Sequence, residues 1–267
     1  MTFRLIFYYI YWSIRLGIPP WWYFQINAEW YNAEKGFYSK IDIDAYIPLK
    51  WRLQQSYLDK NKPPSDFPVF LKPEWGQNSN GIIRIDKLQD FVNFRTKSKI
   101  PYIVQYAAHE CKEYEIFYIR DAENLNQLST LNITQSINYS DERYPINGIH
   151  NKSMIYRDIT ASFSPQEMQI LQRHLQQLPN FRIARVGVRA NSKADLLVGL
   201  LHIIEINLFA PFPIQLLDNT VSKASKRQFI KDNMRHLVKV SNTIPKKYFN
   251  HFVFLKKIIK HYQSKAE

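Results

Sequence analysis

Residues 72–82 read Lys-Pro-Glu-Trp-Gly-Gln-Asn-Ser-Asn-Gly-Ile, and they directly follow the apolar run Phe67-Pro-Val-Phe-Leu71. A lysine at the end of a short strand therefore precedes a loop that contains Gly76, Ser79 and Gly81. The lysine supplies a positive charge, and the small residues let backbone N–H groups approach phosphate oxygens, so the segment is a candidate phosphate cradle. It is not a Walker A loop, because there the lysine follows the glycines. A polar hairpin tip without a ligand is the alternative.

A second informative segment is His202-Ile-Ile-Glu-Ile-Asn207. It has the pattern of a strand, so Glu205 and Asn207 point to the same face. Two hard oxygen ligands side by side suit a Mg²⁺ ion that bridges phosphate groups. The alternative is a pair of solvated side chains at the edge of a sheet.

In this order and spacing, the two segments resemble the ATP-grasp superfamily of carboxylate–amine and carboxylate–thiol ligases. The similarity covers residues 36–218, and it is closest to the D-alanine–D-alanine ligase-like group. The resemblance implies an α+β fold in which two lobes clamp ATP, with ATP and Mg²⁺ as cofactors. It places six residues around the nucleotide: Lys72, Gly76, Ser79 and Gly81 at the phosphates, and Glu205 and Asn207 at the metal.

Three further binding residues follow from the resemblance. The segment Gly36-Phe-Tyr-Ser-Lys40 looks like the upstream lysine that touches phosphate, which makes Lys40 a partner of Lys72; the alternative is one more surface lysine. Gln105 and Glu115 lie in a segment that resembles the hinge between the lobes, where Glu115 would accept hydrogen bonds from the ribose hydroxyls. The family commonly has an acid after Gln105, but here Tyr106 follows, so adenine recognition is left to backbone groups.

The segment Ala184-Arg-Val-Gly-Val-Arg189 resembles the family's Gly-Arg-x-Asp strand. Its arginine, here Arg185, would stabilise the anion that develops during acyl transfer, and Lys72 and Arg185 are the expected catalytic residues. The metal-binding aspartate of the pattern is replaced by Gly187, so we expect weaker Mg²⁺ binding.

The resemblance implies an ATP-dependent carboxylate–amine ligase that forms a C–N bond through an acyl phosphate. Because of Gly187, a non-catalytic nucleotide-binding pseudoenzyme is one alternative, and an ATP-grasp kinase that phosphorylates a hydroxyl is another. Fewer than about forty residues precede Lys40, too few for a further α/β domain. We therefore expect the carboxylate substrate and the amine acceptor to be large or carrier-bound.

The chain as a whole mixes strands and helices without strict alternation, which indicates the α+β class. Four parts are expected: a short N-terminal segment (1–62), an N-lobe with a flap at 74–81 (63–105), a C-lobe with the metal site (106–218) and a basic helical tail (219–267). Apolar periodicity and turn residues predict strands at 67–72, 82–85, 102–106, 114–120, 182–188 and 201–206. They also predict helices at 3–16, 86–94 with Asp86 as the cap, 164–177, 221–241 and 246–263.

The charge balance sets 36 Lys and Arg against 23 Asp and Glu, a formal net charge of +13, which favours anionic partners. No recognisable nucleic-acid module accompanies it. The single cysteine, Cys111, and the lack of an export signal make the cytoplasm the expected compartment. The aromatic segment 1–22 is broken by Arg4 and Arg15, and its apolar run is too short to span a bilayer. We expect a buried amphipathic helix there, with shallow attachment to a membrane surface as the alternative.

Overall fold

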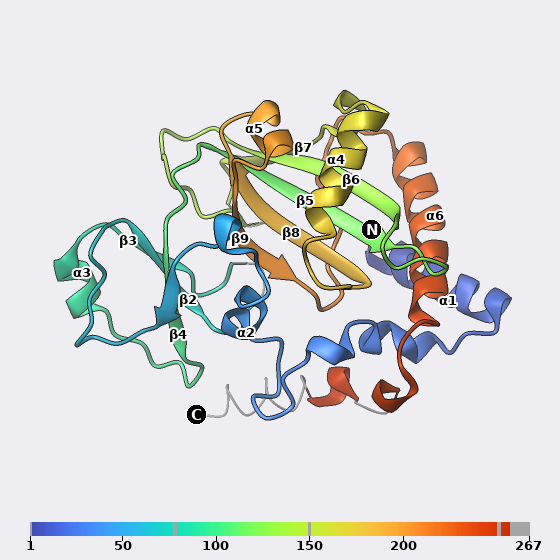
Figure 1. Ribbon diagram of the computed structural model, residues 1–267, viewed down its shortest axis with the longest axis horizontal. Coiled ribbons are helices and arrows are strands. Elements are labelled where there is room, and N and C mark those ends of the chain that lie inside the picture. The colour runs from blue at the N-terminus through green and yellow to red at the C-terminus, as the bar shows by residue number, and fades with distance from the viewer. Residues whose placement is uncertain (1, 77–78, 149–150, 250–251, 257–267) are drawn as a thin grey trace.

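The computed structural model describes residues 2–76, 79–148, 151–249 and 252–256, and it contains two antiparallel sheets with helices around them (Figure 1). The strand order is β1-β4-β2-β3 in the small sheet and β7-β6-β5-β8-β9 in the large sheet. The predicted α+β class is confirmed.

The small sheet consists of β1 (Gln55–Tyr57), β2 (Val69–Pro73), β3 (Ile83–Ile85) and β4 (Tyr102–Tyr106). β2 and β3 form the predicted hairpin. Helix α3 (Leu88–Asn93) covers this sheet and inserts Phe91 into its core. The predicted cap is wrong, because the Asp86 carboxylate lies 3.0 Å from Arg84 and the helix begins after Lys87 without a side-chain cap. β1 precedes residue 63, so the small sheet includes part of the segment predicted to lie outside the N-lobe.

The large sheet consists of β5 (Lys112–Arg120), β6 (Leu128–Asn138), β7 (Met154–Asp158), β8 (Ile183–Ala190) and β9 (His202–Asn207). The sequence patterns predict β5, β8 and β9 but miss β6 and β7. One face of these two strands is polar, with Thr134 opposite Asp158, so neither strand has the apolar signal of a buried strand.

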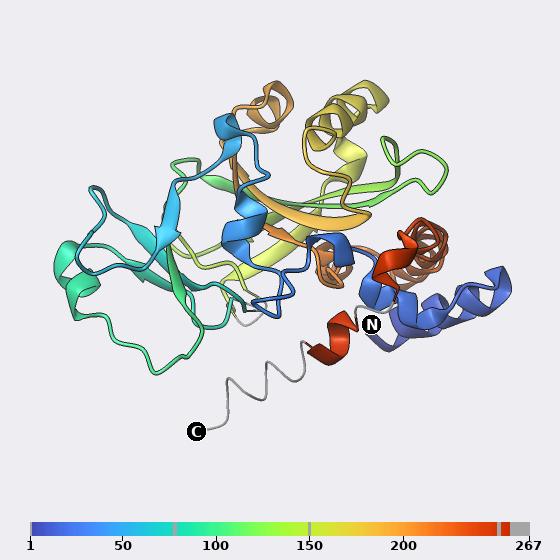
Figure 2. The same cartoon turned by 60° about the horizontal axis from the view of Figure 1, so that its bottom comes forward.

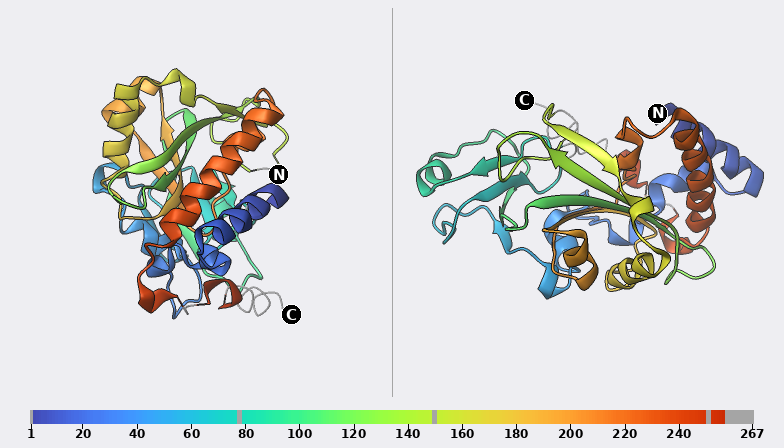
Figure 3. Two further views of the ribbon diagram at one scale, coloured as in Figure 1. Left: turned by 90° about the vertical axis from the view of Figure 1, so that its right-hand side faces the viewer. Right: turned by 90° about the horizontal axis from the view of Figure 1, so that it is seen from above.

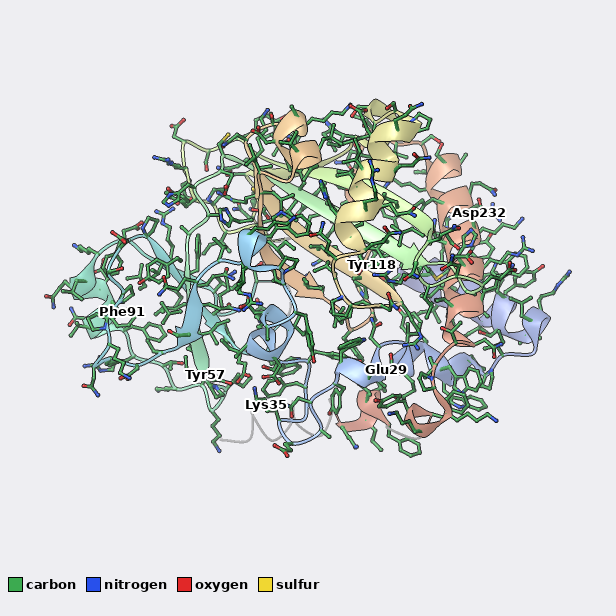
Figure 4. All side chains as sticks on the ribbon, in the orientation of Figure 1. Glu29, Lys35, Tyr57, Phe91, Tyr118 and Asp232 are labelled. Carbon is green, nitrogen blue, oxygen red and sulfur yellow. The ribbon has the colours of Figure 1, made fainter. Side chains whose placement is uncertain are left out.

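The two faces of the large sheet differ in chemistry because side chains alternate along each strand. Ala184, Val186 and Val188 of β8 lie in an apolar core with Tyr118 of β5 (Figure 4). Helices α4 (Pro165–Leu175) and α5 (Lys193–Val198) cover this face. α4 matches the helix predicted at 164–177 and begins with a capping box of Ser164 and Glu167, whereas the short α5 was not predicted.

Helices α1 (Thr2–Leu16) and α6 (Lys223–Ser241) lie side by side at one end of the large sheet (Figure 3). Their inner faces share a core with Phe117 and Ile183 of the sheet. α1 buries only Tyr9 and Ser13, so the expectation of a buried helix is wrong for its outer face. In the part of the chain that the structure describes, no helix is long and apolar enough to cross a membrane.

The predicted tail helix at 246–263 differs from the structure. A 3₁₀ turn, Lys246–Tyr248, follows Pro245, and a second short helical segment lies at residues 253–256. The remainder of the prediction, from residue 257 onward, lies outside the described residues.

The segment between α1 and the small sheet contains 3₁₀ turns and one short helix, α2 (Lys40–Asp44). Buried Asn27 fixes this segment to the large sheet, because its amide donates to the carbonyls of Ile183 (2.7 Å) and Leu208 (3.0 Å). α2 lies between the two sheets (Figure 2), and the Ser39 hydroxyl caps it by accepting from the Asp42 N–H. Lys40 is thereby held at the start of α2, facing the space between the sheets.

Candidate active site

A cavity of about 470 Å³ lies between the two sheets and collects most of the predicted site residues. The small sheet contributes Lys72 and Gln105, and the large sheet contributes Glu115, Arg185, Glu205 and Asn207. Lys40 reaches the cavity from α2, and Gly76 and Ser79 reach it from the hairpin loop. Gly81 is not among the lining residues. Residues 77–78 of the predicted flap lie outside the described part of the chain.

The two lysines lie at the centre of this cavity. The buried Lys72 Nζ donates to Gln105 Oε1 at 2.6 Å and to the Ile204 carbonyl at 3.5 Å. Lys40 Nζ donates to the Pro73 carbonyl at 2.8 Å. Burial lowers the pKa of both lysines, that of Lys40 to about 8, although the nearby Glu205 opposes the shift. Two partly desolvated cations on adjacent elements are a strong attractor for a polyanion such as a phosphate chain.

Glu205 and Asn207 face the same cavity from β9, as the strand alternation predicts. Asn207 Nδ2 donates to Glu205 Oε1 at 2.8 Å. Burial raises the pKa of Glu205, but Arg185 and Lys72 outweigh it, so the pKa is lowered and the side chain is a carboxylate. A carboxylate beside an amide oxygen fits Mg²⁺ when phosphates supply further ligands.

Gly187 lies between two carboxylates of the sheet, opposite Glu115 on β5 and Glu205 on β9. A Cβ at this position would lie 3.2 Å from Ile204 Cγ1 and 3.4 Å from Glu205 Cγ. A longer side chain would therefore have to displace its neighbours. Within the described ranges, no group of three or more His, Cys, Asp or Glu side chains is arranged to hold a metal ion.

Arg185 connects the two halves of the large-sheet site. Its Nε lies 3.0 Å from Glu115 Oε2, its Nη2 lies 3.8 Å from Glu205 Oε1, and its Nη1 donates to the Phe212 carbonyl at 3.1 Å. Burial raises the pKa of Glu115, and the guanidinium of Arg185, 3.0 Å away, opposes the rise by favouring the carboxylate. Glu115, predicted to bind ribose, thus lies in a buried ion pair at the middle of the sheet.

The loop after β2 has the tight geometry that its small residues suggest. Gly81 has a φ of 77°, and a Cβ there would lie 2.9 Å from Pro73 Cγ, so only glycine fits without a shift. Ser79 also has a positive φ, and its hydroxyl donates to the Asn147 carbonyl. This bond ties the loop of the small sheet to a loop of the large sheet, over the cavity.

This chain is similar to known proteins in structure, but no similarity in sequence was found. No family model and no curated protein matches this chain. Among solved structures, the VanG D-Ala:D-Ser ligase from Enterococcus faecalis is similar with a TM-score of 0.52 at 12% identity, over 76% of this chain and 61% of that ligase. The ATP-grasp ligase PsnB is similar with a TM-score of 0.47 at 12% identity, over 76% of this chain and 58% of that one.

The chain has the ATP-grasp fold. The N5-carboxyaminoimidazole ribonucleotide synthetase from Thermotoga maritima is similar at 11% identity, with a TM-score of 0.47, over 75% of this chain and 48% of that enzyme. This chain spans less than two thirds of the length of each of these proteins. Their reactions are therefore not carried over by the fold.

The sequence patterns missed four residues of the cavity. Glu113 lies within 3.4 Å of Arg189 across β5 and β8, and Asn147 Nδ2 donates to Glu113 Oε1 at 2.5 Å. Tyr156 OH donates to Asn147 Oδ1 at 2.9 Å. Strand alternation places Glu113 on the face of Glu115, and Arg189 on the face of Arg185. The period of two therefore predicts both residues for the cavity face. Asn147 lies in the loop between β6 and β7, where no pattern marks it.

The hinge at the end of β4 also differs from the expectation. The N–H groups of Tyr106 and Ala107 donate to the carbonyls of Gln54 (3.0 Å) and Pro68 (3.2 Å). These two donors are therefore occupied, and a base at this hinge would need other partners. Phe70, Tyr106 and Ala108 line the cavity here and offer a mostly apolar slot.

Proposed function

We propose that this protein binds Mg²⁺-ATP in the cavity between its sheets and uses it to join a carboxylate to an amine. The observation that carries the proposal is the convergence of Lys40 and Lys72 on the same space as Glu205 and Asn207. Burying these charged and polar side chains costs free energy, so their convergence needs a bound partner that interacts with all of them. A nucleotide triphosphate with its metal satisfies both groups at once.

In this proposal each part of the reactants lies in its own region of the cavity. The base would lie in the slot of Phe70 and Ala108, and the phosphates would lie against Lys40 and Lys72. Glu205 and Asn207 would hold Mg²⁺, which neutralises charge on the phosphate oxygens when it is bound. Beyond Arg185, the apolar side chains of Phe212, Ile214 and Leu217 line the wall where the acid would lie.

The chemistry proceeds in two steps. An oxygen of the substrate carboxylate attacks the γ-phosphorus, the bond from phosphorus to the ADP oxygen breaks, and the lysines balance the charge of the transferring group. The amine nitrogen then attacks the acyl carbon and loses a proton, and inorganic phosphate leaves. Arg185 holds the oxyanion that forms at that carbon. The loop with Ser79 covers the cavity and protects the acyl phosphate from water.

The first test is isothermal titration of the full chain with a non-hydrolysable ATP analogue, with and without Mg²⁺. We expect Mg²⁺ to strengthen binding, and Glu205→Gln to remove that gain. Glu167→Gln is the matched control, because Glu167 forms an ion pair with Lys193 outside the cavity. Absence of nucleotide binding would contradict the proposal.

The second test identifies the products. A panel of carboxylates and amines is incubated with ATP, and ADP, phosphate and acceptor are analysed together. Release of ADP and phosphate only when an acid and an amine are both present supports a ligase. Phosphate found on a hydroxyl acceptor would make the protein a kinase. If the nucleotide affinity does not depend on Mg²⁺ and no ADP is released, the protein is a non-catalytic nucleotide-binding protein. This is the alternative that Gly187 favours.

A further inference from the structure

Helix α1 has an apolar face that nothing in the described structure covers. Its inner face packs on α6 and the sheet through Tyr8, Tyr9 and Trp12. Its outer face consists of Phe3, Ile6, Phe7, Ile10 and Ile14, which we call the outer stripe. Phe3 is 80% exposed and Ile14 is 74% exposed. A helix that is apolar on both faces is normally buried all round, so the outer stripe requires an occupant.

The charges on α1 and along its seam with α6 indicate which occupant fits. Sequence positions 1–28 contain no Asp or Glu, and α1 itself carries Arg4 and Arg15. Helix α6 lies beside α1 (Figure 3), and it carries three exposed basic side chains, Arg227, Lys231 and Arg235. Three contacts fix these residues next to α1, because Arg227 Nε donates to Tyr8 OH at 3.2 Å, Trp12 Nε1 donates to the Lys231 carbonyl at 2.9 Å, and Arg235 lies over the Trp12 ring.

We propose that the outer stripe docks this protein onto an anionic lipid surface. Apolar and aromatic side chains would enter the boundary between headgroups and acyl chains, while the three basic side chains of α6 contact lipid phosphates. Phe3, Phe7 and Tyr11 supply the aromatic rings that favour this boundary. A protein partner would need acidic residues around an apolar groove, whereas an anionic bilayer offers both features over any area.

The same helix also borders the cavity of the proposed function. Thr2, at the start of α1, lines the cavity together with Arg185 and Phe212. Docking through the outer stripe would therefore bring the acid-binding end of the cavity near the lipid surface.

The experiment is flotation of the purified full chain with vesicles of phosphatidylcholine, with and without phosphatidylglycerol. We expect binding to the acidic vesicles only, and weaker binding as salt is raised. The double variant Ile10→Ser/Ile14→Ser should lower the bound fraction at least about tenfold, because each isoleucine loses its apolar transfer energy. Lys231→Gln should lower it about fivefold, the effect of one basic residue near the surface.

The matched control is Val198→Ser/Leu200→Ser. These side chains are 69% and 65% exposed, but they lie at α5, away from α1 (Figure 1). This control should bind vesicles like the unmodified chain, and circular dichroism should be the same for all variants. The proposal is overturned if acidic vesicles do not bind, or if the stripe variants bind them unchanged. It is also overturned if the stripe variants only convert an oligomer to a monomer, since the outer stripe would then contact another copy of the chain.

This test is independent of the proposed function, because it needs no nucleotide. Vesicle binding without ATP binding would leave the docking surface standing and remove the ligase. The reverse result would remove only the docking surface.

Discussion

The two faces of β8 differ completely although their residues alternate along the same eight-residue strand. On one face, Val186 and Val188 pack into an apolar core under α4 and α5. On the other face, Arg185 and Arg189 form ion pairs with Glu115 and Glu113 of the neighbouring strand. One strand therefore serves a core on one side and a charged cavity on the other.

The comparison shows which face serves folding. Apolar burial contributes to the free energy of folding in proportion to the area removed from water. Buried ion pairs contribute little, because desolvation of the charges offsets their attraction. The charged face therefore adds little to folding, and mutations on the two faces should separate the proposed activity from stability.

Lys72→Ala should give the largest effect on activity. We expect turnover of ATP to fall about 10²–10³-fold, because a positioned cation at the transferring phosphate is lost. The free energy of unfolding should stay the same or rise, since a buried charge is removed. ADP release and urea denaturation measure the two quantities, and Lys62→Ala, an exposed lysine outside the cavity, is the control. Turnover that persists in a folded Lys72→Ala protein would contradict the assignment.

Leu171→Ala tests the opposite face. Leu171 of α4 is fully buried against the apolar side of the sheet. We expect the free energy of unfolding to fall by about 2–5 kcal/mol, because the substitution leaves a cavity. Nucleotide affinity per folded molecule should be unchanged. Weakened nucleotide binding by the folded variant would mean that the two faces are coupled through β8.

Much of the difference between the apolar and charged faces could be predicted from the sequence, because side chains alternate between the two faces of a strand. A period of two assigned Glu205 and Asn207 to one face of β9, and the Lys-Pro strand before a glycine-containing loop predicted the hairpin of β2 and β3. The same rule would have added Glu113 and Arg189. Long-range pairing could not be predicted in this way, because which strands become neighbours depends on packing across the whole chain.

The missed elements have a common physical cause. β6 and β7 carry polar residues along one face, and Asn147 lies in the loop that joins them, so none of these has the apolar signal of a buried strand. The exposure of α1 was missed for the opposite reason. Its apolar residues predict burial, and only the three-dimensional arrangement shows that one face stays uncovered.

Arg185→Gln should have a smaller effect than the first two changes. It leaves Glu115 in the sheet without its counter-ion, so we expect a loss of about 2 kcal/mol in the free energy of unfolding, less than for a fully buried pair. The second substitution Glu115→Gln should restore most of this stability. ATP binding should persist, while formation of the joined product falls relative to ADP release. Equal losses of binding and product would place Arg185 at the nucleotide instead of the acyl group.

The smallest expected effect is the pH dependence that Lys40 imposes on nucleotide affinity. Burial lowers the pKa of Lys40 to about 8 in the free protein. Phosphates favour the charged lysine, so the pKa rises when ATP binds, and binding above pH 8 must take up a proton. Affinity should be level below pH 8 and fall above it, with a slope that approaches tenfold per pH unit.

Titration calorimetry in buffers of different ionisation enthalpy measures this proton uptake directly. Lys40→Arg is the matched variant, because arginine keeps its charge throughout this range and should flatten the profile. The stability of the free protein should change in the opposite direction. The unfolded lysine titrates near 10.5, so between pH 8 and 10.5 the unfolded chain holds the extra proton and the contribution of Lys40 to stability rises with pH. An affinity that is independent of pH from 7 to 10 would show that Lys40 does not contact the phosphates, and would leave Lys72 as the phosphate-binding lysine.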